Sequence, residues 1–180
     1  KHKGICCLVV PTNAPGVTLG HHENKMGQRC SDTRRIAFDS VRVPKDHMIG
    51  SPGEGFKIAM QTLDTSRPMT AAVAVGIGRA ACEHALAYSK ERKQFGAAIS
   101  TFQGIQFMLA DMATAVDAAR LLTWRSAWLI DSGKTASLES SMAKRVSADT
   151  AMSVTTDAVQ IFGGYGYTKE YPVEKLMRDA

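Results

Sequence analysis

Three short segments of this 180-residue sequence combine residue types that are suited to binding a ligand. The first runs from Gln160 to Tyr167 and contains Gly163, Gly164 and Gly166. Glycine permits a positive φ and lets the backbone approach a flat ring or a phosphate closely. The same pattern is typical of an ordinary helix end. By itself it predicts a turn and is compatible with a binding role.

The second and third segments are polar and adjoin expected helices. In Glu91–Gly96, Arg92 offers a planar fork for a phosphate, and Phe95 offers a ring that covers an apolar surface. A basic last turn before a glycine stop is the other interpretation. In Asp64–Pro68, charged and hydroxyl groups precede a proline, which indicates either a surface patch or a pocket wall.

Composition argues against several other classes of protein. The five histidines lack the spacing of metal ligands, so we expect no metal site. No apolar run approaches the roughly 20 residues that a membrane helix needs, so we expect no membrane association. The formal net charge is +5, but the basic residues are scattered, so we expect no nucleic-acid partner.

Two kinds of secondary structure must position these segments. From Ile5 to about Val43, short β-branched runs alternate with turn residues, a pattern that predicts short strands. These strands are too few to close a barrel. They form a small open sheet, or further strands lie upstream. The expected strands are Ile5–Val10, Val17–Leu19, Arg35–Phe38 and Val41–Val43.

Long helices follow, with apolar residues at three and four spacing. Pro68 should kink the first helix or mark its restart. Helices of this length with short loops predict an antiparallel bundle, and the fold class is α+β, mainly α. The expected helices run from Phe56 to near Arg92, from Thr101 to Ser132, from Ala136 to Phe162, and from Glu174 to Arg178.

Taken in order, the segments resemble the acyl-CoA dehydrogenase family, most closely its medium-chain members. The signature Q-x-x-G-G-x-G-Y-x-x-E-x-x-x-x-K-x-x-x-D is met at every specified position from Gln160 to Asp179. The resemblance covers the whole chain. It also rests on Arg92–Gly96, Gly55–Lys57 with Asp64–Arg67, and Met26–Thr33 with Val41–Pro44.

The resemblance implies a domain order and a set of binding residues. Residues 1–52 look like the latter part of a β middle domain, and 53–180 like a carboxy-terminal helical bundle domain, incomplete at its end. Asp64, Thr65, Ser66 and Arg67 match the segment that borders the acyl-CoA. The residues that match contacts to an FAD shared across a dimer interface are Arg92, Lys93, Gln94, Phe95, Phe102, Gln103, Gln160, Ile161, Phe162, Gly163 and Gly164.

The implied enzyme oxidises acyl-CoA to trans-2-enoyl-CoA in fatty-acid β-oxidation. It passes electrons to an electron-transferring flavoprotein, as a homotetramer in the mitochondrial matrix. The reaction needs a glutamate to remove the α proton. Most members carry it in a segment after the signature aspartate, and some carry it where this chain has Ser66. We therefore expect no catalytic residue within residues 1–180, and expect this polypeptide alone to be inactive.

Three alternatives remain at the level of sequence. An acyl-CoA oxidase of the same family would return electrons to oxygen. A nucleic-acid-binding relative would show steep salt-dependent binding to duplex DNA, and the net charge of +5 is the only sign of it. A non-catalytic helical assembly module would reveal itself by its mass in solution.

Overall fold

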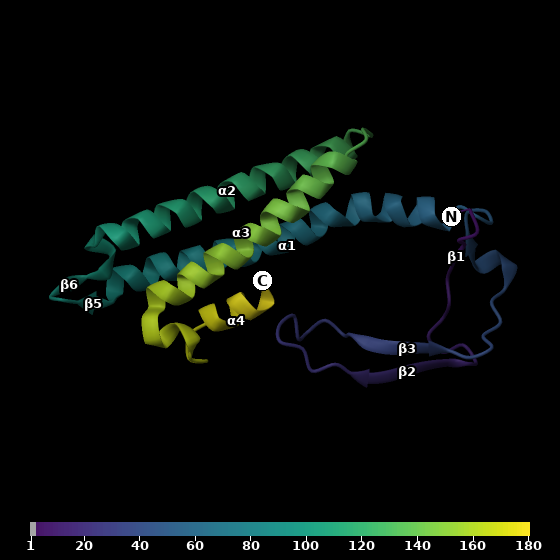
Figure 1. Cartoon of the computed structure of the whole chain (residues 1–180), viewed down its shortest axis with the longest axis horizontal. Helices are drawn as coiled ribbons and strands as arrows, with labels where there is room; N and C mark the ends of the chain where they lie inside the picture. The colour runs from purple at the N-terminus through teal and green to yellow at the C-terminus, as the bar shows by residue number, and fades with distance from the viewer. Residues whose placement is uncertain (1–2) are drawn as a thin grey trace. The chain divides into compact units, whose positions relative to one another are not determined.

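The computed structural model describes residues 3–180, so the first two residues of the expected middle-domain segment lie outside it. Two compact units are present, Lys1–Leu63 and Asp64–Ala180. Helix α1, Gly55–Glu91, begins in the first unit and continues into the second (Figure 1). The predicted class, α+β and mainly α, is confirmed.

The first unit contains short antiparallel strand pairs and a 3-10 turn, η1, at Lys45–His47. Strand β1, Cys7–Leu8, pairs with β4, Met48–Ile49. Strand β2, Val17–His22, pairs with β3, Arg34–Phe38, and the register shifts between Leu19 and His22.

The expected strand at Val41–Val43 is wrong. The ladder between β2 and β3 ends where the Asp39 amide donates to the Gly16 carbonyl at 2.9 Å. Ser40 then has a φ of 52°, a left-handed conformation that turns the chain away from β2. Pro44, which follows, has no amide to donate to a ladder.

The second unit contains the carboxyl part of α1 and three further helices, and consecutive long helices run antiparallel (Figure 1). These are α2, Gln103–Asp131; α3, Ser137–Phe162; and α4, Val173–Asp179. A hairpin of β5, Lys93–Gln94, and β6, Ala97–Ala98, joins α1 to α2 through the 3-10 turn η2, Ile99–Thr101. The 3-10 segment η3, Gly163–Tyr167, follows α3.

Helix α1 continues through Pro68 without a restart. Proline has no amide hydrogen. Pro68 therefore cannot donate the hydrogen bond that the carbonyl of Asp64, four residues earlier, would normally accept. The Ser140 hydroxyl of α3 donates to that carbonyl instead, at 2.8 Å. The helix is continuous through Pro68, and a neighbouring helix replaces the lost donor.

Small residues let the long helices approach closely in the middle of the second unit. A Cβ built on Gly78 of α1 would lie 3.4 Å from Val116 Cγ2 of α2 and 3.8 Å from Ala151 Cα of α3. The buried core around this crossing is apolar, and it fixes the helix ends on which the candidate site lies. Its members are Ala81, Ala85, Ile99, Met112, Val116, Val154, Ala158, Ile161, Phe162 and Val173.

Candidate functional site

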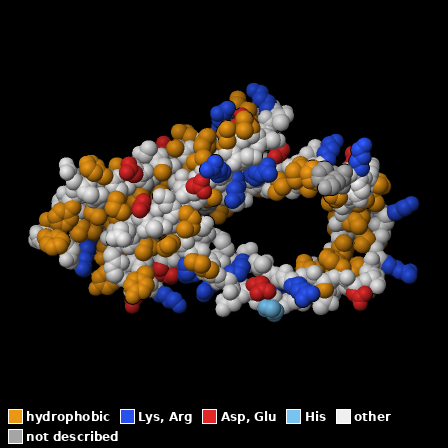
Figure 2. Space-filling view, viewed as in Figure 1, with side chains coloured by type: hydrophobic (Ala, Val, Ile, Leu, Met, Phe, Trp, Pro, Cys, Tyr) orange, Lys and Arg blue, Asp and Glu red, His pale blue; other side chains and the backbone are white. Residues whose placement is uncertain are grey.

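A pocket of about 660 Å³ lies where the carboxyl ends of α1 and α3 meet the amino end of α2. Hydrophobic side chains gather on the surface of this end of the helical unit, around β5 and β6 (Figure 2). The volume falls within the range of small-molecule sites, about 300–1,000 Å³. The lining consists of Tyr88, Arg92, Gln94, Phe95, Ile99, Phe102, Ile105, Gln160, Ile161, Phe162, Gly163, Gly164, Tyr165 and Thr168.

The β5–β6 hairpin turns through Phe95 and Gly96, which have φ values of 52° and 80°. Two consecutive positive φ angles match a type I′ turn, which favours asparagine and glycine, so a phenylalanine here is strained. Phe95 is 95% exposed, and its ring meets Phe102 edge-on with centroids 6.2 Å apart. The turn therefore holds a large aromatic side chain out at the rim of the pocket.

Stacked aromatic rings form the floor of the pocket. Tyr88 lies 4.0 Å from Phe162, centroid to centroid, with the planes 13° apart, and Tyr171 meets both rings edge-on. The Arg92 guanidinium lies 5.5 Å from the centroid of Tyr165. Burial raises the pKa of the Tyr88 phenol, and the nearby Arg92 cation lowers it by a smaller amount. The floor thus combines flat apolar surfaces with one oriented cation.

The glycines after α3 have different structural requirements. Gly163 has a φ of 61° and its amide donates to the Gln160 carbonyl, which ends the helix. A Cβ on Gly166 would lie 2.2 Å from the Val159 carbonyl oxygen, whereas a Cβ on Gly164 would meet no atom within 4 Å. Gly166 is therefore needed for packing, while Gly164 leaves open space beside the pocket.

Most of the residues expected to contact a cofactor come together here. Arg92, Gln94, Phe95 and Phe102 line the pocket with Gln160–Gly164, while Lys93 and Gln103 lie in the adjoining elements outside the lining. Sequence reasoning missed Tyr88, Ile99, Ile105, Tyr165 and Thr168. Tyr88 stands four residues before Arg92 and so shares its helix face, a spacing that predicts proximity.

The segment Asp64–Arg67 lies at the other end of the helical unit. Its distance from Arg92 along α1 is roughly 40 Å, at about 1.5 Å per residue. Arg67 Nη1 donates to Asp64 Oδ1 at 2.9 Å, and the Ser137 hydroxyl donates to the other carboxylate oxygen. Thr65 lines a second cavity of about 330 Å³, with Pro68, Met69, Ala72, Thr123, Trp124, Ala127, Ile130 and Asp131.

The last two residues of the signature, Lys175 and Asp179, lie on α4. Lys175 pairs with Asp179 one turn later, and Arg178 donates to Glu174 at 2.8 Å through Nε.

No aspartate or glutamate lines the larger pocket. Across residues 3–180, no cluster of three or more His, Cys, Asp or Glu side chains has the arrangement of a metal site. No helix in the same range is long and apolar enough to cross a bilayer.

Residues 53–180 match the family model described as the acyl-CoA dehydrogenase C-terminal domain. The chain belongs to the acyl-CoA dehydrogenase family. Among curated members, the mitochondrial short-chain specific acyl-CoA dehydrogenase of Bos taurus is 50% identical over 179 residues, which cover 99% of this chain and 43% of the bovine protein. The chain therefore spans less than half the length of the acyl-CoA dehydrogenases that it matches.

Solved structures of the family have the same fold. Butyryl-CoA dehydrogenase from Megasphaera elsdenii superposes with a TM-score of 0.97 and is 48% identical, covering 99% of this chain and 46% of that one. A chain in the structure described as the electron transferring flavoprotein of Acidaminococcus fermentans superposes with a TM-score of 0.96 and is 51% identical. The match covers 98% of this chain and 46% of that one. These acyl-CoA dehydrogenase relatives are named short-chain or butyryl-CoA enzymes, whereas the sequence resemblance pointed to medium-chain members.

Proposed function

We propose that this chain supplies the carboxy-terminal part of an FAD-dependent acyl-CoA dehydrogenase that converts acyl-CoA to trans-2-enoyl-CoA in fatty-acid β-oxidation. The observation that carries the proposal is the pocket formed jointly by Arg92, the hairpin tip and the glycine turn. In this proposal residues 1–52 belong to the β middle domain and 53–180 to the helical domain. The start of the family match at residue 53 supports that division.

The chemistry of the pocket suits a flavin. Rings from Phe95, Phe102 and the Tyr88–Phe162 stack offer flat apolar faces for an isoalloxazine or adenine ring. Arg92 would hold an anionic phosphate, and the amides of Gln94 and Gln160 would donate or accept hydrogen bonds. Open space beside Gly164 admits a ligand to the backbone. When bound, the flavin supplies the hydride acceptor, and the chain binds and orients it.

The exposure of Phe95 supports the proposal of a flavin shared between two copies of the protein. A 95% exposed aromatic ring, held outward by two positive φ angles, costs free energy unless another surface covers it. We therefore propose that the hairpin reaches a flavin carried mainly by a neighbouring protomer, within a homotetramer. The matched cofactor residues Lys93 and Gln103 would contact the same group.

The acyl-CoA is proposed to border Asp64, Thr65, Ser66 and Arg67. Electron-transferring flavoprotein is the proposed electron acceptor, supported by the Acidaminococcus fermentans relative at 51% identity. The mitochondrial matrix stays a prediction. The bovine relative supports it, and a Megasphaera elsdenii relative at 49% identity supports a bacterial setting equally well.

Replacing Arg92 by alanine in the full-length protein tests the cofactor assignment. A hydrogen bond to a charged group contributes about 1.5–3 kcal/mol, so flavin affinity should fall roughly ten- to hundredfold. Bound flavin is measured as the ratio of flavin to protein absorbance after gel filtration, and circular dichroism checks the fold.

The matched control is Arg79→Ala. Arg79 lies on α1, the helix that ends just before Arg92; its side chain is 62% exposed, and it pairs along the surface with Glu83 at 3.4 Å. Its removal should leave flavin content unchanged. Full flavin content in Arg92→Ala would contradict the proposed contact.

A further inference from the structure

The end of the helical unit far from the pocket contains a chain of buried hydroxyl groups. Pro68 is buried in α1. It has no amide hydrogen, so it cannot donate to the Asp64 carbonyl one turn earlier. The Ser140 hydroxyl of α3 lies 2.8 Å from that carbonyl oxygen and 2.9 Å from the Ser126 hydroxyl of α2. Ser126 and Ser140 are both 0% exposed.

Hydroxyl chemistry fixes the direction of this chain. A serine hydroxyl has one hydrogen, and a carbonyl oxygen can only accept. Ser140 therefore donates to the Asp64 carbonyl, and Ser126 must donate to Ser140. One directional chain of hydrogen bonds thus links α2, α3 and α1 at the position where the proline has removed the intrahelical bond of α1.

Two further hydrogen bonds hold the Asp64 side chain at the same place. The Ser137 hydroxyl, from the first turn of α3, donates to one carboxylate oxygen, and Arg67 donates to the other at 2.9 Å. Both the backbone and the side chain of Asp64 are consequently held by the start of α3. The turn Asp64–Arg67 thus has its conformation set from outside its own helix.

We infer that Ser140, oriented by Ser126, is a positioning residue for the segment Asp64–Arg67. The inference rests on the proposed function, in which that segment borders the acyl-CoA. Ser140 supplies the donor that Pro68 lacks, which keeps the carbonyl of Asp64 paired and the following turn in one conformation. Asp64 itself is a structural anchor of the segment, since both its carboxylate oxygens are bonded within the protein.

The same bundle provides a matched control. Ser147 lies two turns after Ser140 on α3, is also 0% exposed, and contacts the Thr123 hydroxyl of α2 at 3.3 Å. That pair joins α2 to α3, and the Thr123 hydroxyl donates to the Ala119 carbonyl of its own helix at 2.8 Å rather than to the Asp64 carbonyl of α1. A serine that matters only for packing α2 against α3 should behave like Ser147.

The test is a double-mutant cycle in the full-length protein with butyryl-CoA and a dye acceptor. Ser140→Ala removes the side-chain donor from the partly buried Asp64 carbonyl. It should raise the KM about tenfold, while kcat changes less and bound flavin is unchanged. In the Pro68→Ala background, residue 68 regains an amide that can donate to Asp64. There the same serine substitution should raise the KM less than about twofold.

Each alternative result is decisive. An unchanged KM in Ser140→Ala, an equal effect in both backgrounds, or an equal effect from Ser147→Ala would overturn the inference. Should Ser140→Ala fail to fold, recovery of folding in Pro68→Ala/Ser140→Ala supports it and absence of recovery overturns it. If the wild-type protein is inactive towards acyl-CoA, only the proposed function is contradicted. The coupling between positions 68 and 140 is then measured from urea unfolding midpoints instead of KM.

Discussion

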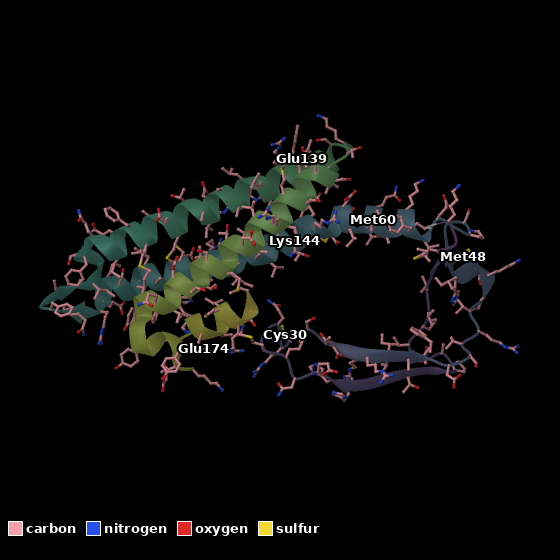
Figure 3. All side chains as sticks on the ribbon, viewed as in Figure 1. Cys30, Met48, Met60, Glu139, Lys144 and Glu174 are labelled. Carbon is pink, nitrogen blue, oxygen red and sulfur yellow. The ribbon has the colours of Figure 1, made fainter. Side chains whose placement is uncertain are left out.

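The two ends of the helical unit are built from different side chains. Figure 3 marks them with Glu139, near the start of α3, and Glu174, on α4 beyond the end of α3. At the first end, the hydroxyl end, hydrogen bonds from Ser126 to Ser140 and from Ser140 to the Asp64 carbonyl join the helices. At the second, the aromatic end, rings stack around a pocket of about 660 Å³.

Side-chain size explains why the pocket of about 660 Å³ at the aromatic end is larger than the cavity of about 330 Å³ at the hydroxyl end. Serine is small enough for helix backbones to approach, and each buried hydroxyl then finds a partner on the next helix. Aromatic rings hold the helix ends apart, and they pack in stacked or edge-on pairs that leave volume between them. The comparison indicates that hydrogen bonds between helices set the backbone of Asp64–Arg67 at the hydroxyl end, whereas stacked rings provide flat apolar surfaces at the aromatic end.

The largest expected effect is at the aromatic end. Phe162 is 5% exposed and stacks on Tyr88, so Phe162→Ala should lower the free energy of unfolding by about 3–5 kcal/mol. The control is Phe107→Ala on α2, where the ring is 62% exposed and the change should stay within about 0.5 kcal/mol. Urea unfolding followed by circular dichroism measures both. Equal losses would mean that the stack is not part of the core.

The glycine turn allows a finer division of the aromatic end into packing and binding roles. Gly166→Ala forces a methyl group to within 2.2 Å of the Val159 carbonyl oxygen, so it should destabilise the protein by about 1–3 kcal/mol. Gly164→Ala meets no atom within 4 Å and should keep stability within about 0.5 kcal/mol. Its methyl group enters the space proposed for the flavin, so flavin content should fall.

Thermal unfolding and flavin absorbance separate these two outcomes. The proposed division requires Gly166→Ala to lose stability and Gly164→Ala to lose flavin. If both variants lost stability to the same extent, or if Gly164→Ala retained full flavin, the open space beside Gly164 would have no binding role.

The regular parts of the fold were predictable because local signals determine them. Helix α3 ends at Phe162, as the glycine cluster after it predicts, and α4 follows Pro172, which suits the first turn of a helix. The β5–β6 hairpin was not predicted, since its turn is Phe95–Gly96 rather than an Asn-Gly pair and its strands have low β propensity. Only the structure shows this strained turn.

The candidate site was predictable in part for a similar reason. Arg92 and Gly163–Gly164 carry local signals, and the structure brings them to one pocket. The bond from Ser140 to Asp64 joins residues 76 apart in sequence, and buried helical serines give no local sign of their partners. Nor did the sequence reveal that Asp64–Arg67 and Arg92 lie at opposite ends of the helical unit, because that separation depends on α1 continuing through Pro68.

The smallest expected effect is a difference in alkaline stability that depends on the aromatic end alone. Burial raises the pKa of Tyr88 above the ordinary tyrosine value of about 10. Since the folded state retains this proton longer than the unfolded state, the contribution to stability is fully present below that pH and is lost as pH rises through the raised folded pKa. Tyr88→Phe keeps a ring to stack on Phe162 but has no proton to release. Its stability should therefore fall less steeply than that of the wild type above pH about 10.

Screening keeps this effect small, because Tyr88 is only partly buried. Urea midpoints measured from about pH 9 upwards compare wild type, Tyr88→Phe and Ser140→Ala. Serine hydroxyls do not ionise in this range, so Ser140→Ala should lower the midpoint at every pH and leave the alkaline slope of the wild type unchanged. A slope for Tyr88→Phe equal to that of the wild type would show that the phenol at the aromatic end is as well solvated in the folded protein as in the unfolded chain.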